Sequence, residues 1–339
     1  VVGRPGEALD LMIRAFQLTR TLIPSLSLGA LDTALRIVLD FVLERRLYGA
    51  RAWDLPLVRH GLVDAFVDLT LVEVVATSAA RALHLRPGQM RLRSAIAKFL
   101  AGHLTAASLA SLAGFLGARH YLRAGHGHGI FQKILRDHAV VPVFHAGSFL
   151  LLETIHLHLP DLARARRSGK PPEPATPSSF DPSVDLPPLD ERALVVWARE
   201  GDEATAGLAD LESRLGPGTV DLVRWLAAQL DAEAAALPAA LAAEGRDTGR
   251  TPQSFDRARR YALLHAGAAA VHTWAAGGES AFAHREEWLR LALRRVAAAL
   301  GRTDRPWPDP DAEALADELC ALHRQDRLFS TVSFPLGRR

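Results

Sequence analysis

A stretch of twenty residues without a formally charged side chain, residues 99–118, most constrains the fold of this chain. It is long enough to cross a lipid bilayer. However, its small residues and hydroxyls make it only moderately hydrophobic, and no basic cluster follows it immediately. We therefore expect a helix that is buried on all sides by neighbouring helices or by a subunit interface, and we expect no transmembrane segment.

The N-terminal part carries apolar residues at spacings of three and four, which is the periodicity of one helix face. We expect a long helix over 8–46, bent at Pro24. Gly49 should end this run, with Arg45 in the last turn, where a cation suits the helix dipole.

The same periodicity continues to about residue 167. It predicts two more long helices, a Gly-rich loop and a fourth apolar segment, at 54–85, 89–116, 123–129 and 140–167. Long helices with short connections predict an antiparallel four-helix bundle.

The chain beyond this bundle is predicted to form a second helical domain. Residues 168–187 are rich in Pro and Ser and should form a stiff, exposed linker. From about Asp190 the pattern becomes helical again, with expected helices from Pro217 and over 252–275, 281–300 and 311–323. The predicted fold is therefore all-α, with a bundle at 1–167, a linker at 168–187 and a helical extension at 188–339.

The composition fits this class of fold and limits the chemistry. Apolar residues make up 49% of the 339 residues, with only three Tyr, which favours packed helices over sheets. The single cysteine, Cys320, excludes a disulfide framework within one chain and predicts a cytoplasmic protein. The chain begins with Val1, so we expect a fragment or a processed chain, and no secretory signal opens it.

The net charge of +2 conceals two halves of opposite sign. Residues 1–170 carry 21 Lys and Arg against 12 Asp and Glu, whereas residues 171–339 carry 19 against 26. Two readings are open: the halves attract one another or another subunit, or the basic half binds an anionic ligand such as a nucleotide-bearing thioester. Nucleic-acid binding is not expected, because the basic residues are not interleaved with aromatic residues and no known motif is present.

Three blocks stand in order along the first 155 residues. They are Glu44-Arg45-Arg46-Leu47-Tyr48-Gly49, then Leu116-Gly117-Ala118-Arg119-His120-Tyr121, then the segment 131–148 around Arg136-Asp137. Together they resemble the C-terminal helical bundle of the acyl-CoA dehydrogenase family. Residues 188–339 resemble, more loosely, the helical extension of long family members, while the N-terminal helical domain and the β-domain of the family have no counterpart in this chain.

The resemblance implies an FAD-dependent α,β-dehydrogenation of acyl thioesters in fatty acid metabolism, with acyl-CoA or an acyl-carrier thioester as substrate. Arg45 matches the family arginine that reaches FAD across a subunit interface, and Gly117 matches a glycine where the backbone approaches the cofactor. Gln17 and Arg20 match positions that line the acyl-CoA pocket. For Arg45 and Gly117 the alternatives are a helix-end cation and a helix C-cap. For Gln17 and Arg20 the alternative is a solvated helix face.

The sequence departs from the family at the base that takes the α proton. His145 stands at the usual glutamate position, and Thr19 stands where other members place that glutamate. Imidazole accepts a proton near neutral pH, so His145 is the candidate base, with a packed histidine as the alternative. Most other flavin-contact positions are also unmatched, at Leu47, Pro56, Gly114, Ala118 and His120.

These losses leave three functional classes open. The first is a flavoprotein of this family, homo- or hetero-oligomeric through the bundle, whose isolated chain is inactive. The second is a non-catalytic oligomerisation subunit of such a complex, and the third is a helical module that binds an acyl carrier or a membrane face. No metal site is expected, because the alternating histidines at 126, 128, 156 and 158 lack carboxylate or cysteine partners at zinc spacing.

Overall fold

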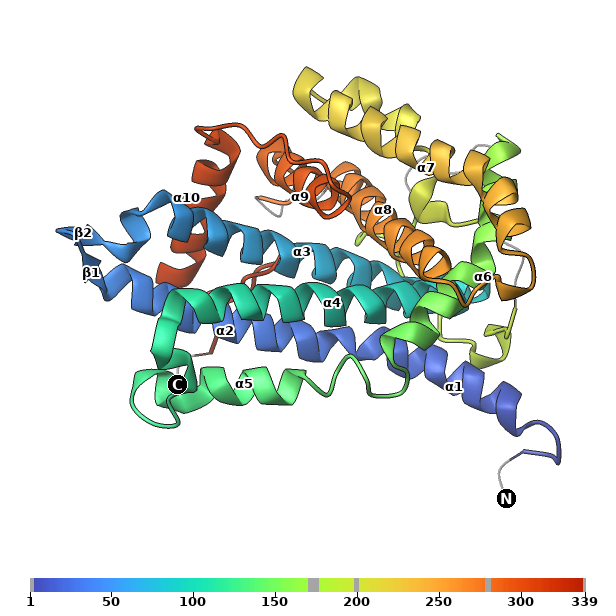
Figure 1. The fold of residues 1–339 in the computed structure, drawn as a ribbon, viewed down its shortest axis with the longest axis horizontal. Helices are drawn as coiled ribbons and strands as arrows, with labels where there is room; N and C mark the ends of the chain where they lie inside the picture. The colour runs from blue at the N-terminus through green and yellow to red at the C-terminus, as the bar shows by residue number, and fades with distance from the viewer. Residues whose placement is uncertain (1–2, 170–176, 198–200, 278–281, 338–339) are drawn as a thin grey trace.

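Three helices, α2 (Pro24–Glu44), α3 (Pro56–Leu85) and α4 (Met90–Leu116), run antiparallel along the long axis of the molecule (Figure 1). The computed structural model describes residues 3–169, 177–197, 201–277 and 282–337. Its other helices are α1 (Ala8–Leu22), α5 (Ile130–His138), α6 (Ser148–Arg167), α7 (Pro217–Glu244), α8 (Pro252–Ala276), α9 (Glu286–Ala299) and α10 (Pro310–Arg324). Two strands of two residues each, β1 (Arg46–Leu47) and β2 (Ala50–Arg51), form a small antiparallel hairpin. The prediction of an all-α fold is confirmed.

The first predicted helix is two helices in line. Only Ile23 separates α1 from α2, and it keeps helical dihedral angles, while Pro24 takes the first position of α2, where a missing N–H costs nothing. The predicted end was wrong, because α2 stops at Glu44 and Arg45 is extended with ψ 123°. The Arg45 carbonyl accepts a hydrogen bond from the Ala52 amide at 2.7 Å, so the hairpin draws this residue out of the helix.

The other bundle helices match the predictions unevenly. The predicted limits of α3 and α4 are confirmed to within two residues. Gly117 ends α4 with φ 57°, a conformation that disfavours any residue with a Cβ. The predicted start of the fourth apolar segment at residue 140 was wrong, because turns occupy 139–147 and α6 begins only at Ser148. The sequence did not predict α5.

Helix α4 packs against α1, α2, α3 and α6, yet it is not buried on all sides. Small or polar residues at helical spacing remain exposed along its outer face, namely His103, Ala106, Ala107, Ala110, Ser111 and Gly114. We call this set the small-residue face. The segment Pro87–Tyr121 passes a length-and-hydropathy test for a membrane span, with 56% of its most apolar window buried in the protein. A core helix of a bundle passes the same test.

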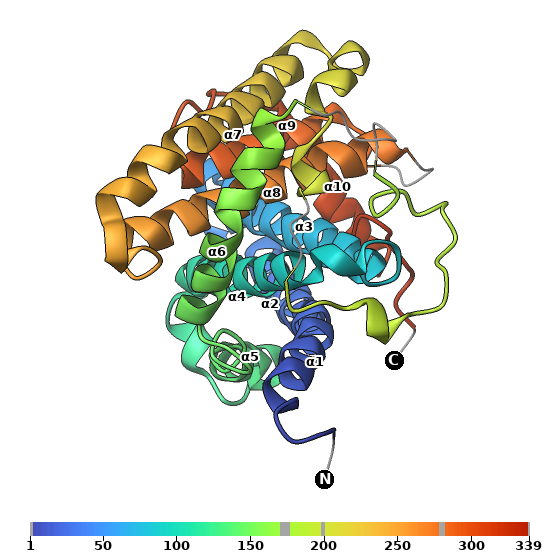
Figure 2. The same ribbon diagram turned by 90° about the vertical axis from the view of Figure 1, so that its right-hand side faces the viewer.

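The C-terminal helices lie against the bundle rather than apart from it (Figures 1 and 2). Helices α8, α9 and α10 pack on α3, and one hydrophobic core runs from Leu31 in α2 to Phe329 near the C-terminus. The predicted start of α7 at Pro217 is confirmed, and the predicted limits of α8 and α10 are confirmed to within one residue. Helix α9 begins at Glu286, and residue 281, where it was expected to start, lies outside the described residues. The division into two domains stays a prediction.

Residues 177–197 form an irregular segment that follows the bundle surface, where helix had been expected from about Asp190. Bundle side chains hold its backbone: Arg81, His84, Gln17 and Arg91 contact carbonyl groups of Ser178, Asp181, Val184, Pro187, Val195 and Val196. Within the predicted linker, Ser179 and Phe180 are buried, whereas most residues of 182–187 are exposed, as predicted. Residues 170–176 of the linker lie outside the described residues.

The opposite charges of the two halves meet at their contact. Basic residues of the first half pair with acidic residues of the second in Arg59–Glu313, Arg93–Glu203 and Arg166–Asp231. Other pairs join a basic residue of the second half to an acidic residue of the first, among them Arg295–Asp68 and Arg305–Asp64. These contacts support mutual attraction of the two halves as one origin of the charge asymmetry.

Thr251 is the N-cap of α8, since its hydroxyl accepts a hydrogen bond from the Ser254 amide at 3.0 Å. We expect Thr251→Ala to lower the free energy of unfolding by about 1 kcal/mol, because a helix amide loses its acceptor. Urea unfolding measures the change. Thr33→Ala is the control, because that hydroxyl only bonds back to the Gly29 carbonyl within α2; an equal loss in both variants would contradict the capping role.

Candidate functional site

The structure brings together the two positions at which the sequence lacks the expected glutamate. Thr19 lies in α1, and His145 lies in the turn between α5 and α6. The Thr19 Oγ1 and His145 Nδ1 atoms are 3.1 Å apart, within hydrogen-bond distance. Phe16 and Phe144 pack beside the imidazole, with ring centroids 5.4 and 3.8 Å from it. Neither base position holds a carboxylate.

The backbone of His145 is in the left-handed region, with φ 59°, which is unfavourable for a residue other than glycine. Lys98 of α4 explains how this conformation is held. Its ammonium group, on a side chain that is 1% exposed, contacts the carbonyls of Phe144 and Ala146, which flank His145. Burial, together with the charge of Arg20, lowers the pKa of Lys98 to about 8, so the group stays mainly cationic at neutral pH.

Arg20, one residue from Thr19, is a buried cation with no counter-ion in the described part of the chain. Its side chain is 7% exposed and stacks on the Phe16 ring at 5.2 Å. Among the described residues it forms no ion pair, and its Nε finds no hydrogen-bond acceptor. Burial lowers the pKa of Arg20, and the charge of Arg91 lowers it further. An uncompensated buried charge is costly, and such groups mark candidate binding sites.

Gln17 lies on the same face of α1 as Arg20, but its side chain already contacts the irregular segment 177–197. Its amide Nε2 donates to the Val195 carbonyl at 2.8 Å, which ties the irregular segment to α1. Its Oε1 has no hydrogen-bond partner among the described residues. Gln17 therefore offers one free acceptor beside Arg20, and the predicted substrate role of both residues stays a prediction.

Hydrogen bonding at Thr19 favours one tautomer of His145. The Thr19 hydroxyl also lies 3.4 Å from the Phe16 carbonyl, to which it donates. A hydroxyl that donates there accepts from Nδ1–H of His145, and the unprotonated nitrogen of the imidazole is then Nε2. An imidazole oriented in this way has one basic nitrogen available for proton transfer.

The predicted flavin residues lie at the opposite end of the bundle from His145 (Figure 1). Arg20 and Arg45 are separated by about 35 Å along the line of α1 and α2, at 1.5 Å per residue. Arg45 is exposed, and its guanidinium bonds to no described residue, so it is free to meet a pyrophosphate. A Cβ on Gly117 would meet nothing within 4 Å, so the backbone there is open to a ligand.

Arg45 and Gly117 therefore fit a place beside FAD, but they supply only one charge and one backbone position. The neighbouring His120 is engaged, with its Nδ1 2.6 Å from the Gly117 carbonyl. No group of three metal-ligating side chains occurs within the described part of the chain.

The comparisons with known proteins agree on the bundle. The family model described as acyl-CoA dehydrogenase, C-terminal domain matches residues 7–148. Residues 7–148 are therefore similar to this C-terminal domain. The matched range holds Thr19, Arg20, Lys98 and His145, together with Arg45 and Gly117. No curated protein sequence matches the chain.

Several solved structures are similar in fold to most of the chain. An acyl-CoA dehydrogenase complexed with FAD from Bacillus anthracis superposes with a TM-score of 0.60 at 10% identity, over 92% of this chain and 56% of that one. Acyl-CoA oxidase3 from Yarrowia lipolytica gives 0.60 at 13% identity, over 95% and 49%. ACDH-11 from Caenorhabditis elegans, in complex with C11-CoA, gives 0.52 at 15% identity, over 91% and 47%. The chain thus spans about half the length of the structures it matches.

Sequence reasoning missed Lys98 and Arg91. Lys98 immediately precedes the charge-free stretch, on a helix that was predicted to be buried. A lone cation on a buried helix needs carbonyl or carboxylate partners, so the position of Lys98 could have predicted a polar contact there. Its actual partners, the carbonyls around His145, depend on a turn that the local sequence did not specify.

Proposed function

We propose that this chain is the helical part of an acyl-CoA dehydrogenase-type flavoprotein that acts on acyl thioesters. In this proposal His145 accepts the α proton through Nε2, and Thr19 orients the imidazole through Nδ1. FAD, held in part by Arg45 and the open backbone at Gly117 of a neighbouring subunit, would supply the acceptor for the hydride from the β carbon. Gln17 and Arg20 would contact the substrate.

The unpaired Arg20 beside the Thr19–His145 pair is the observation that carries the proposal. Removal of an α proton from a thioester places negative charge on the thioester oxygen. Arg20 and Lys98 are buried cations without ion-pair partners among the described residues, so they suit such a developing charge. His145 offers its basic Nε2 beside these two cations, so the same site holds a proton acceptor and positive charge.

The names of similar proteins support the cofactor and substrate classes. One structure of this fold is complexed with FAD and another with C11-CoA. We extend both to this protein as proposals, along with an oligomeric state and a cytoplasmic location.

The test is acyl-CoA-dependent bleaching of the flavin in the FAD-loaded protein or its natural complex. We expect His145→Ala to slow flavin reduction about 100-fold or more, the usual contribution of a positioned base. Thr19→Val should slow it less and shift its pH profile, because the imidazole loses its orienting partner. His84→Ala, a histidine on α3 that contacts the Pro187 carbonyl, is the matched control.

A second function stays open because neither base position holds a carboxylate. The chain would then be a non-catalytic subunit that oligomerises through its bundle, and the exposed small-residue face of α4 favours this, since small side chains allow close helix approach. Flavin reduction that is unchanged in His145→Ala, or absent in the natural complex with every acyl-CoA offered, would exclude His145 as base and leave this second function.

A further inference from the structure

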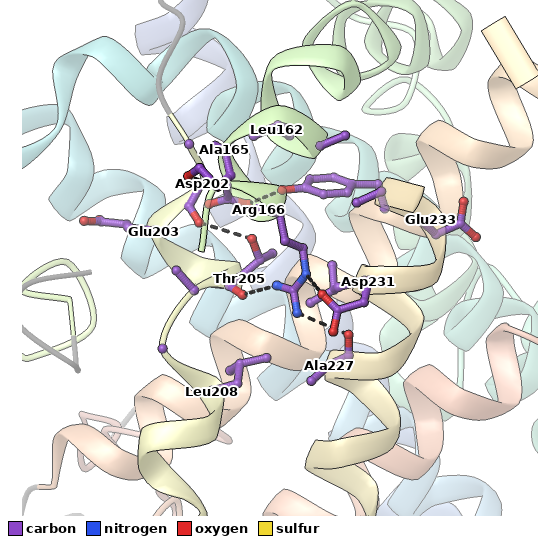
Figure 3. A pocket seen from close by; sticks show the side chains of 18 of the residues that line it. Leu162, Ala165, Arg166, Asp202, Glu203, Thr205, Leu208, Ala227, Asp231 and Glu233 are labelled. Atoms are coloured by element: carbon purple, nitrogen blue, oxygen red, sulfur yellow. Dashed lines mark hydrogen bonds and ion pairs between the residues drawn. The ribbon is translucent and has the colours of Figure 1, made fainter. Parts of the chain in front are cut away.

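A cavity of about 590 Å³ lies between the C-terminal half of α6, the helix α7 and the segment 201–210 (Figure 3). It is separate from the proposed thioester site, because His145 precedes the N-terminus of α6 whereas the cavity begins at Leu159 near the other end. Protein interiors are close-packed, and voids much larger than a water molecule are few. A space of this size is typical of small-molecule sites.

The wall of the cavity is apolar. Helix α6 contributes Leu159, Leu162 and Ala163. Helix α7 contributes residues spaced by three and four positions, which form one face of the helix: Ala227, Leu230, Ala234 and Leu237. Alanines on both helices keep the space open, because larger side chains there would fill it. The wall therefore suits an aliphatic chain or an apolar ring system.

The cations that line the cavity are already neutralised. Arg166 donates to the Asp231 carboxylate at 2.6 Å and to the carbonyls of Thr205 at 2.9 Å and Ala227 at 3.2 Å (Figure 3). Arg257 is paired with Glu244. The charges of both guanidinium groups are therefore compensated, although Arg257 Nε has no hydrogen-bond partner among the described residues.

The carboxylates that line the cavity are in excess, and one of them is free. Asp202 accepts hydrogen bonds from Tyr261 at 2.9 Å and His265 at 2.6 Å, and Glu203 is paired with Arg93 and Arg86. Glu233 is paired with Arg260 at 2.6 Å. The carboxylate of Asp210, on the exposed side of the cavity, has no hydrogen bond or ion pair with any described residue. The uncompensated charge at the opening is therefore negative.

From this geometry we infer that the cavity binds a small hydrophobic amine, with its apolar part between α6 and α7 and its cationic head at Asp210. Charge complementarity selects this class, because an amine gains an ion partner at Asp210. A carboxylate or phosphate head would meet like charge and no free cation, so a fatty acid or an acyl-CoA is disfavoured. The inference does not depend on the proposed dehydrogenase function.

Calorimetric titration of the purified protein with decylamine, decanol and decanoate tests the inference, because the three probes share one chain and differ in head group. We expect saturable binding with decylamine tightest and decanoate weakest. Asp210→Asn should weaken decylamine about fivefold and leave decanol unchanged, as a partly exposed ion pair contributes about 1 kcal/mol. Asp210 is exposed, so this variant should fold normally.

Ala234→Phe tests the apolar wall, because its ring would occupy the cavity; we expect decylamine affinity to fall at least tenfold. Ala235→Phe, at the neighbouring exposed position of α7, is the matched control and should bind as the parent does. The inference is overturned if decylamine shows no saturable binding, or if decanoate binds as tightly. It is also overturned if Asp210→Asn leaves the preference for the amine intact, or if a folded Ala234→Phe protein keeps full affinity.

Discussion

Replacement of Trp288 by alanine is expected to lower the free energy of unfolding by about 3–5 kcal/mol, the usual cost of truncating a fully buried aromatic side chain. Trp288 is 0% exposed and has the largest side chain among the fully buried residues. Its indole N–H donates to Thr70 Oγ1 at 2.9 Å, which joins α9 to α3 across 218 positions of sequence. The variant thus loses both a large apolar contact and the hydrogen bond between the two halves.

Urea unfolding followed by circular dichroism measures this loss. Trp288→Phe should lose less, because it keeps most of the buried volume and forfeits mainly the hydrogen bond. Trp307→Ala is the control, since that side chain is 69% exposed and should change stability by no more than about 0.5 kcal/mol. Equal stability of Trp288→Ala and the parent protein would show that α9 does not pack on α3 in solution.

Acidification from pH 6.5 to pH 4 is expected to remove up to about 3 kcal/mol of stability through His272 alone. Burial lowers the pKa of His272 to about 4, although the hydrogen bond to the Ala206 carbonyl and the charges of Glu203 and Asp202 act to raise it. The folded-state pKa therefore lies below the value of about 6.5 in the unfolded chain. As the pH falls, the unfolded chain takes up the proton first, so this stabilisation is complete above pH 6.5 and is lost toward pH 4.

The free energy of unfolding at a series of pH values tests this expectation. His272→Gln keeps a donor for the Ala206 carbonyl but cannot titrate, so its stability should change less over this range. Asp202 affects stability at a lower pH than His272. Burial raises the pKa of Asp202, but His265, Arg93 and Tyr261 lower it to about 2. The stability that the ionised Asp202 contributes is therefore lost only below about pH 4. The same pH slope in His272→Gln and the parent would contradict the role of His272.

The helices that the sequence predicted well are those with local signals at both ends. Helix α3 stops before Pro87 and Gly88, and α4 stops at Gly117, because these residues act on the backbone regardless of their surroundings. Helices α7 and α8 begin with Pro217 and Pro252 for the same reason. The spacing of apolar residues in these helices predicts which face is buried, but it does not predict which other helix packs against that face.

The predictions that were wrong fall where contacts with residues distant in sequence outweigh the local backbone preference. Arg45 leaves its helix because a hairpin bonds it to Ala52, and residues 177–197 stay irregular because side chains of the bundle satisfy their carbonyls. The cavity between α6 and α7 could not be foreseen, because it depends on the spacing of two helices that are far apart in sequence.

The sequence alone determined the all-α fold, the family resemblance of the bundle and the missing glutamate at His145 and Thr19. These features depend on periodicity and on residue identity, which the sequence contains directly. Only the tertiary structure decided that Thr19 and His145 meet at 3.1 Å and that Lys98 holds the turn that contains His145. It also decided that Arg20 is buried without a counter-ion among the described residues. Distance and burial arise when helices pack, and no local pattern in the chain specifies them.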